Sequence, residues 1–451
     1  MEQSNQKSLE EINNTVPIPE KKSSSLKKLI AFSGPGALVA VGYMDPGNWI
    51  TSIQGGALYG YLLLSVILLS SLIAMLLQTM CAKLGIVTGT DLAQATKNLV
   101  GNKISFFLWI IAELAIISTE IAEVIGSAIA LNLLFKIPLI IGVIITIIDV
   151  FLLLILVKYG IRKIEALVFV LIATIFFIFM YEVALANPSI KSILLSFIPK
   201  KEILIAHVDK KESAFFIALG IVGATVMPHN LYLHSSIVQS RKYDRINEDS
   251  IKEAIKYAKI DSNIQLSFSF IINCLLLILG SALFFGKNPD DIGRFTQLYD
   301  ALKNRDMVGI IASSTLATLF ALALLFSGQN ATITGTLTGQ IVMEGFINLK
   351  LSIWKRRMLT RALAIMPVIS CIYYWGNRED VVEKLLVYTQ IFLSLSLPIS
   401  MIPLLYLTSS KKTMGKFSNC FLASMLGWIS TVVLLILNSQ LILETLQSVF
   451  N

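Results

Sequence analysis

The stretch Asp45-Pro46-Gly47-Asn48 interrupts the first apolar segment of the chain. A carboxylate at membrane depth costs about 3 kcal/mol on insertion scales, so it needs a physical reason to be there. Pro46 lacks a backbone donor and Gly47 weakens a helix, so the sequence predicts that the helix unwinds beside Asp45. Non-helical backbone at that depth is tolerated only where it lines a cavity or is buried in protein. Asp45 and Asn48 would then present oxygen atoms at a gap in a helix, as a cation site requires.

The composition indicates an integral membrane protein. Of the 451 residues, 55% are hydrophobic and only 15% are charged, which is far from the balance of a soluble domain. The net charge of +8 is explained by basic loops and does not indicate nucleic-acid binding. The first 28 residues are polar and are interpreted as a cytoplasmic tail, not a signal peptide. The four cysteines show no paired spacing, so no disulfide framework or zinc site is expected.

Long apolar runs predict helical spans, and we expect eleven of them. Lys and Arg gather in alternate short loops, which places the amino terminus inside and, with an odd number of spans, the carboxyl terminus outside. The expected spans cover residues 29–56, 62–85, 105–134, 137–157, 163–187, 214–240, 260–286, 308–336, 359–376, 384–408 and 417–438.

A second interruption, around Met227-Pro228-His229-Asn230 in the sixth span, repeats the x-Pro-x-Asn pattern of the first. Matching broken helices in two halves are the sequence pattern that points to a transporter's central site. Five is odd, so two five-helix repeats would have opposite orientations. The expected organisation is a cytoplasmic tail (1–28), a first repeat (29–187), an extracellular loop (188–213), a second repeat (214–408), and an eleventh helix with an extracellular carboxyl terminus (409–451).

Asp45, Asn48 and Met227 form the main metal-site hypothesis. Carboxylate and amide oxygens suit hard cations, whereas a thioether suits softer transition ions. Pro228 leaves the carbonyl of Ala224 without its helical partner, so this oxygen is a further candidate ligand. The alternatives are that Met227 only fills space in the core and that Asp45 belongs to a structural ion pair.

Glu113, Glu120 and Glu123 share the third span. At about 100° per residue, Glu120 lies about 20° and Glu123 about 80° from Glu113, so all three occupy one side of the helix. Such a stripe indicates a water-filled proton path, with interhelical salt bridges as the alternative, favoured for Glu113. Arg361, just inside the ninth span, is the candidate partner, unless it extends to the cytoplasmic interface.

Of the remaining polar residues, one is a candidate functional residue and the others have structural interpretations. His229 lies one residue past the second break, where an imidazole suits proton relay. His234 is interpreted as a packing histidine, and Gln390 as an interhelical hydrogen-bond partner. Residues 327–340 are rich in small and polar side chains, which suits close helix contact or a re-entrant segment.

These motifs together resemble the Nramp family (natural resistance-associated macrophage proteins), the proton-coupled divalent metal transporters. The similarity runs from about residue 29 to 410. One departure is Glu120, where relatives commonly have Asp; the charge is kept and the reach is longer. The matching segments are Gly42-Tyr43-Met44-Asp45-Pro46-Gly47-Asn48-Trp49, Met227-Pro228-His229-Asn230-Leu231-Tyr232-Leu233-His234, residues 112–126 and residues 328–340.

The resemblance implies an all-α, LeuT-like fold with an inverted 5+5 repeat and broken helices one and six. It implies a metal site formed by Asp45, Asn48, Met227 and the Ala224 carbonyl, and it adds Gln390, which matches a glutamine that reaches the metal when the site closes. The implied proton route runs through Asp45 and the third span, with Glu120 and Glu123, and through His229, with Arg361 as charge partner. The thioether argues against the family's magnesium-importing branch.

We therefore expect a multi-pass cell-membrane transporter that imports Mn2+ or Fe2+ by proton symport. It would not be an enzyme, and we expect no cofactor, no nucleic acid and no obligate protein partner; its partners would be the metal ion, protons and the lipid bilayer. One alternative is a sodium- or proton-coupled amino-acid transporter of the same fold. Another is a membrane-embedded metalloenzyme, which would need a third strong ligand and an activated water.

Overall fold

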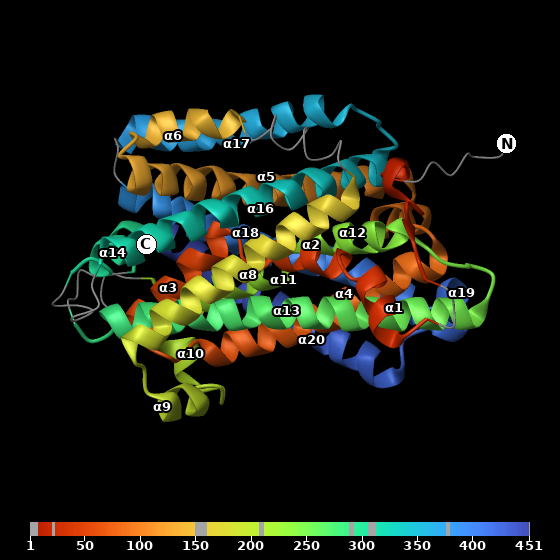
Figure 1. Cartoon of the computed structure of the whole chain (residues 1–451), viewed down its shortest axis with the longest axis horizontal. Coiled ribbons are helices and arrows are strands. Elements are labelled where there is room, and N and C mark those ends of the chain that lie inside the picture. The colour runs from red at the N-terminus through yellow and green to blue at the C-terminus, as the bar shows by residue number, and fades with distance from the viewer. Residues whose placement is uncertain are drawn as a thin grey trace.

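The computed structural model describes residues 8–19, 23–148, 160–206, 212–287, 293–304, 313–375 and 379–450. It is a helical bundle with one minimal strand pair near the amino terminus. Its longer helices run roughly along the long axis of Figure 1. The described elements are η1 (Glu10–Ile12), β1 (Val16–Pro17), α1 (Ser25–Phe32), α2 (Pro35–Gly42), α3 (Pro46–Tyr59), α4 (Leu64–Thr88), α5 (Leu92–Phe135), α6 (Leu139–Ile145), η2 (Thr146–Ile148), α8 (Ile161–Ala186), α9 (Ile190–Leu195), α10 (Glu202–Ile205), α11 (Ala214–Val226), α12 (Pro228–Ile237), η3 (Val238–Ser240), β2 (Arg241–Lys242), α13 (Glu248–Phe284), α14 (Phe295–Ala301), α16 (Ser314–Ile347), α17 (Ile353–Trp375), α18 (Glu379–Ser409), α19 (Lys411–Met414), η5 (Gly415–Phe417) and α20 (Phe421–Phe450).

Among the described residues, eight helical segments are long and apolar enough to cross a membrane. The first expected span is present as two short helices, α2 and α3, on either side of the break. The ninth corresponds to α17, whose four basic residues near its start lower its mean hydropathy. The fourth begins as α6 and η2, but residues 149–157 of that expected span lie outside the described part of the chain. The count of eleven stays a prediction.

The helices that carry the two breaks lie inside the bundle. α13 packs along α2, α3 and α4, α18 packs along α11, and α16 packs along α5. Figure 1 places α1, α12 and α19 toward one end of the long axis and α14 and α10 toward the other. The peripheral helix α20 is the least covered of the membrane-crossing candidates. The broken helices are therefore surrounded by other helices, which shields their non-helical backbone from lipid.

The first break occurs where the sequence predicts it. Helix α2 ends at Gly42 and α3 begins at Pro46, with Asp45 in an extended conformation between them. The freed carbonyl groups find side-chain donors: Asn48 donates to the Tyr43 oxygen at 2.6 Å, and Asn273 of α13 donates to the same oxygen at 3.1 Å. Buried backbone that leaves a helix is thus satisfied by amides from neighbouring positions.

The second break occurs at Met227, between α11 and α12. Its backbone has φ 34° and ψ 107°, and Pro228 starts the next helix. A positive φ is costly for a residue with a side chain, so the surrounding structure must hold it. The Asn48 amide reaches the Ala224 carbonyl at 3.5 Å, and the Tyr43 hydroxyl reaches the Val226 carbonyl at 3.5 Å. Side chains from the first break therefore bond to backbone at the second.

The small-residue stretch at 327–340 makes the close helix contact that its composition suits, because a Cβ added to Gly328 would clash with Ser127 of α5. The alternative, a re-entrant segment, is wrong, because α16 continues through the stretch to Ile347, past the expected end of the eighth span. Two expected helix starts were also wrong. The seventh span begins earlier, since Asn247 caps α13 and accepts hydrogen bonds from the backbone of Asp249 and Ser250. The third begins at Leu92 and bends at Gly101, whose φ is 75°. Hydropathy marks the membrane portion of a helix, not its continuation into water.

Candidate functional site

Asp45 lies fully buried at the meeting point of the two breaks. Its carboxylate caps α3, accepting from the backbone N–H of Gly47 at 3.2 Å and of Asn48 at 3.0 Å. An anion at a helix amino terminus is favoured by the helix dipole. Each carboxylate oxygen has a second lone pair, so capping leaves acceptor capacity toward a cation.

Two amide oxygens beside Asp45 have no hydrogen-bond partner among the residues that the structure describes. They are Oδ1 of Asn48 and Oε1 of Gln390, both on fully buried side chains. Gln390 of α18 lies directly against the first break, because a Cβ added to Gly47 would overlap its Nε2 and would lie 3.0 Å from Asp45 Oδ2. A buried acceptor without a partner costs about 1–3 kcal/mol. Two such oxygens next to one carboxylate form a donor set suited to a cation.

Met227 contributes the sulfur at this place. Its side chain is fully buried and packs with Ala115 of α5 and Leu393 of α18, and the Asn230 amide lies 3.7 Å from its sulfur. The Ala224 carbonyl, whose usual helical donor is replaced by Pro228, accepts the weak contact from Asn48 described above. The structure therefore brings the five predicted positions into one region, joined by the Asn48–Ala224 contact and by the packing of Gln390 on Gly47.

The three glutamates of α5 face basic residues of α17, as the helical spacing predicts. Glu120 accepts from Arg357 at 2.6 Å and from the Thr360 hydroxyl at 2.8 Å. Glu123 lies 3.3 Å from Arg357 and 3.9 Å from Arg361. These four charged side chains are buried. They form an interhelical network in which one arginine joins two carboxylates.

Sequence reasoning missed two members of this network. The arginine that pairs with Glu120 is Arg357, and Glu113 pairs with Arg356 at 2.7 Å. Both arginines lie between the expected eighth and ninth spans, 308–336 and 359–376, where the sequence predicts a loop. Arg361 does lie in the network, but it contacts Glu123 and donates to Thr332 at 3.2 Å. The available signal was the four-residue spacing of Arg357 and Arg361, which places them on one face of a helix.

The two histidines have different hydrogen-bond surroundings. His234 Nδ1 lies 3.0 Å from Oε1 of Gln78, whose amide in turn donates to the Tyr43 hydroxyl at 2.8 Å. Within the described part of the chain, His229 has a single contact of 3.5 Å between Nδ1 and the Thr119 hydroxyl, and its Nε2 has no partner. Thr119 precedes Glu120 on α5. His229 therefore lies between the second break and the carboxylate helix.

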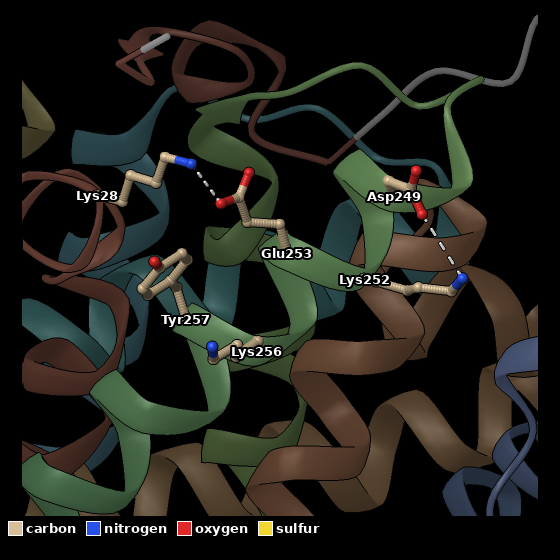
Figure 2. Close-up of a pocket in the computed structure, with 6 residues that line it drawn as sticks. All are labelled: Lys28, Asp249, Lys252, Glu253, Lys256 and Tyr257. Atoms are coloured by element: carbon tan, nitrogen blue, oxygen red, sulfur yellow. Dashed lines mark hydrogen bonds and ion pairs between the residues drawn. The ribbon is translucent and has the colours of Figure 1, made fainter. Parts of the chain in front are cut away.

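A cavity of 470 Å³ on the surface is separate from this site. Figure 2 shows Lys28 directed toward Glu253 and Lys252 beside Asp249, with Tyr257 and Lys256 along the same helix. None of the predicted site residues lines it. The pocket belongs to the contact between α1 and the start of α13.

The fold and the site together define a polytopic α-helical membrane protein with two broken helices that meet beside a buried carboxylate. Residues 36–444 match the family described as "Natural resistance-associated macrophage protein-like". The chain belongs to the Nramp family.

Relatives and solved structures agree with this assignment. The chain is 59% identical to the divalent metal cation transporter MntH of Latilactobacillus sakei, covering 97% of this chain and 94% of the relative. It is similar to the manganese transporter of Eremococcus coleocola, with a TM-score of 0.89, 49% identity, and coverage of 96% and 90% of the two chains.

More distant structures show the fold alone. Mhp1, a nucleobase-cation-symport-1 family transporter, matches with a TM-score of 0.59 at 15% identity, covering 94% of this chain and 92% of its own. MhsT in complex with L-phenylalanine matches with a TM-score of 0.56 at 14% identity, covering 93% and 100%. The expected LeuT-like fold is confirmed.

Proposed function

We propose that this protein is a secondary transporter that imports divalent transition metal ions, Mn2+ and Fe2+, by proton symport. The observation that carries the proposal is the donor set at the two breaks: one carboxylate, two unpartnered amide oxygens, a backbone carbonyl and a thioether. Oxygen ligands with one soft sulfur suit a transition ion better than Ca2+ or Mg2+. The names of the relatives, a divalent metal cation transporter and a manganese transporter, support the same substrate class.

The proposed metal ligands are Asp45, Asn48, Gln390, Met227 and the carbonyl of Ala224. The two breaks allow each half-helix to move about the site, so that access alternates between the two sides of the membrane. A fully helical backbone would have no free carbonyl at this depth. Metal binding by these groups therefore requires both broken helices.

The proposed proton route uses Asp45, His229 and the carboxylates Glu120 and Glu123, with Arg361 and Arg357 as charge partners. The network of buried acids and bases between α5 and α17 supports this route, because intramembrane ionisable groups are expensive and mark ion or proton paths. A proton crossing 100 mV releases about 2.3 kcal/mol, which is enough to bias metal uptake.

We place the protein in the cell membrane, with a cytoplasmic amino terminus and an extracellular carboxyl terminus. The supporting observation is the charge of the loops at the α1 end of the bundle, which include Arg241, Lys242 and the lysines of α19. Cytoplasmic loops carry an excess of Lys and Arg.

The test is Mn2+ uptake into proteoliposomes with simultaneous recording of internal pH. With an acidic outside, we expect Mn2+ entry accompanied by internal acidification. Asp45→Asn should abolish both signals. The matched control is Asp91→Asn, because Asp91 also caps a helix with its carboxylate but caps the start of α5. Mn2+ entry without acidification would overturn proton symport, and absence of Mn2+ entry would overturn the transport proposal.

A further inference from the structure

The amino-terminal segment, residues 8–17, is not a free tail but lies against the bundle; we call it the strap. Ser8, Leu9 and Val16 are buried, at 2%, 8% and 5% exposure. The strap contains the short helix η1 and strand β1. A polar stretch before the first span was expected to be only a cytoplasmic tail, so this ordered contact is a finding of the tertiary structure.

One end of the strap is held by α16. The backbone N–H of Leu9 donates to Oε2 of Glu344 at 2.9 Å, in the last turn of that helix. Glu10 lies 3.5 Å from Lys350 in the connection that follows. Helix α16 packs along α5, so this end of the strap is fixed to a helix that packs against the one carrying the glutamates.

The other end of the strap is held just beyond α12, the second half of the broken sixth span. Asn14 donates its backbone N–H to the Gln239 carbonyl at 3.0 Å. Val16 and Pro17 pair in parallel with Arg241 and Lys242. Backbone pairing fixes this end in register, because each residue has a defined partner.

The strap therefore spans the contact between α12 and α16. These helices touch directly, since the ring of Tyr232 packs against that of Phe346 with centroids 5.5 Å apart. An opening between them moves the strap's two attachment points apart, which favours release of one of them. A cavity of 610 Å³ lies under the α16 end, lined in part by Leu9, Gln340 and Trp354.

We propose that the strap is a latch that stabilises the state in which α12 is closed against α16. Its position on the cytoplasmic side follows from the proposed orientation, but the latch does not depend on which ion is carried. Release at Glu344 would let α12 move while the strand pair stays with it. Weakening either attachment would then raise the population of the state open at the α1 end.

The experiment measures accessibility and needs no transported ion. Ser236 is the reporter, because it is buried, lies on α12 four residues after Tyr232 and so shares its face toward α16. In a background with the four native cysteines replaced by alanine, Ser236→Cys is labelled from the α1 side with a charged maleimide in inside-out vesicles. Val16→Asp and Glu344→Ala should each raise the labelling rate at least fivefold.

Thr15→Val is the matched control, since the Thr15 hydroxyl bonds only within the strap, to the Ile12 carbonyl at 2.7 Å. It should leave the labelling rate unchanged. Unchanged labelling in Val16→Asp and Glu344→Ala would overturn the latch, and so would an equal rise in all three variants. If Val16→Asp does not yield folded protein, Glu344→Ala decides the question alone. Loss of Mn2+ uptake with normal labelling would count against the proposed function but not the latch.

Discussion

Arg357 provides the most direct test of the network between α5 and α17. Its guanidinium is fully buried and joins Glu120 at 2.6 Å to Glu123 at 3.3 Å. Arg357→Gln removes the charge that compensates two buried carboxylates. Breaking a buried ion pair by removing one partner costs about 3–5 kcal/mol. We expect a loss of this size in the free energy of unfolding, measured by equilibrium unfolding in mixed detergent micelles.

The matched control is Arg356→Gln. Arg356 neighbours Arg357 on α17 but pairs with Glu113, whose side chain is 15% exposed. Partial exposure lets water solvate the carboxylate that remains, so we expect a smaller loss than for Arg357→Gln, below about 3 kcal/mol. The comparison separates the effect of burial from that of removing an arginine from this turn of the helix.

A double variant completes the argument. Combining Arg357→Gln with Glu120→Gln removes both charges of the 2.6 Å pair, so its loss should be smaller than the sum of the two single losses by about 2 kcal/mol. The reasoning fails if Arg357→Gln costs no more than Arg356→Gln, or if the two losses simply add. Either result would mean that water or a shared proton already compensates these carboxylates.

Three further predictions concern the break region and the α1 end. Met227→Ala should increase Ca2+ uptake more than it lowers Mn2+ uptake, because the thioether disfavours hard cations. If Ca2+ is still excluded in uptake competition, the Met227 sulfur does not select the ion. Gly47→Ala should raise the Mn2+ Kd about tenfold in calorimetry, because its Cβ would displace Gln390; an unchanged Kd would exclude Gln390 as a ligand. Glu165→Gln should lower the free energy of unfolding by about 3 kcal/mol, since it leaves buried Arg241 without the carboxylate 2.6 Å away. A loss below about 1 kcal/mol, as for an ion pair on the surface, would contradict this prediction.

The sequence by itself located both helix breaks. Pro46 and Pro228 remove backbone donors within apolar segments, and polar residues flank each of them. Proline alone does not break a helix here, since α17 continues through Pro367 and α18 through Pro398 and Pro403. Asp45 and Asn48 follow from the same stretch, because polar groups at that depth require burial in protein. The stripe of glutamates on α5 also follows from local geometry, since helical spacing alone decides which residues share a face.

Only the tertiary structure decided which partners these groups meet. Arg357, not Arg361, pairs with Glu120, because the register of α17 against α5 is set by packing over the whole helix and not by the local sequence. The orphaned oxygen of Gln390 becomes part of the site only when α18 packs on Gly47.

The order of the amino-terminal strap also could not be predicted from the sequence. Its composition is polar, and nothing local requires it to be ordered. Its order comes from one carboxylate on α16 and one strand partner after α12, more than 200 residues away in sequence. Local patterns fix where a helix breaks or which face is polar, because those depend on neighbouring residues. Contacts between distant segments depend on how the whole bundle packs, and they determine the site and its latch.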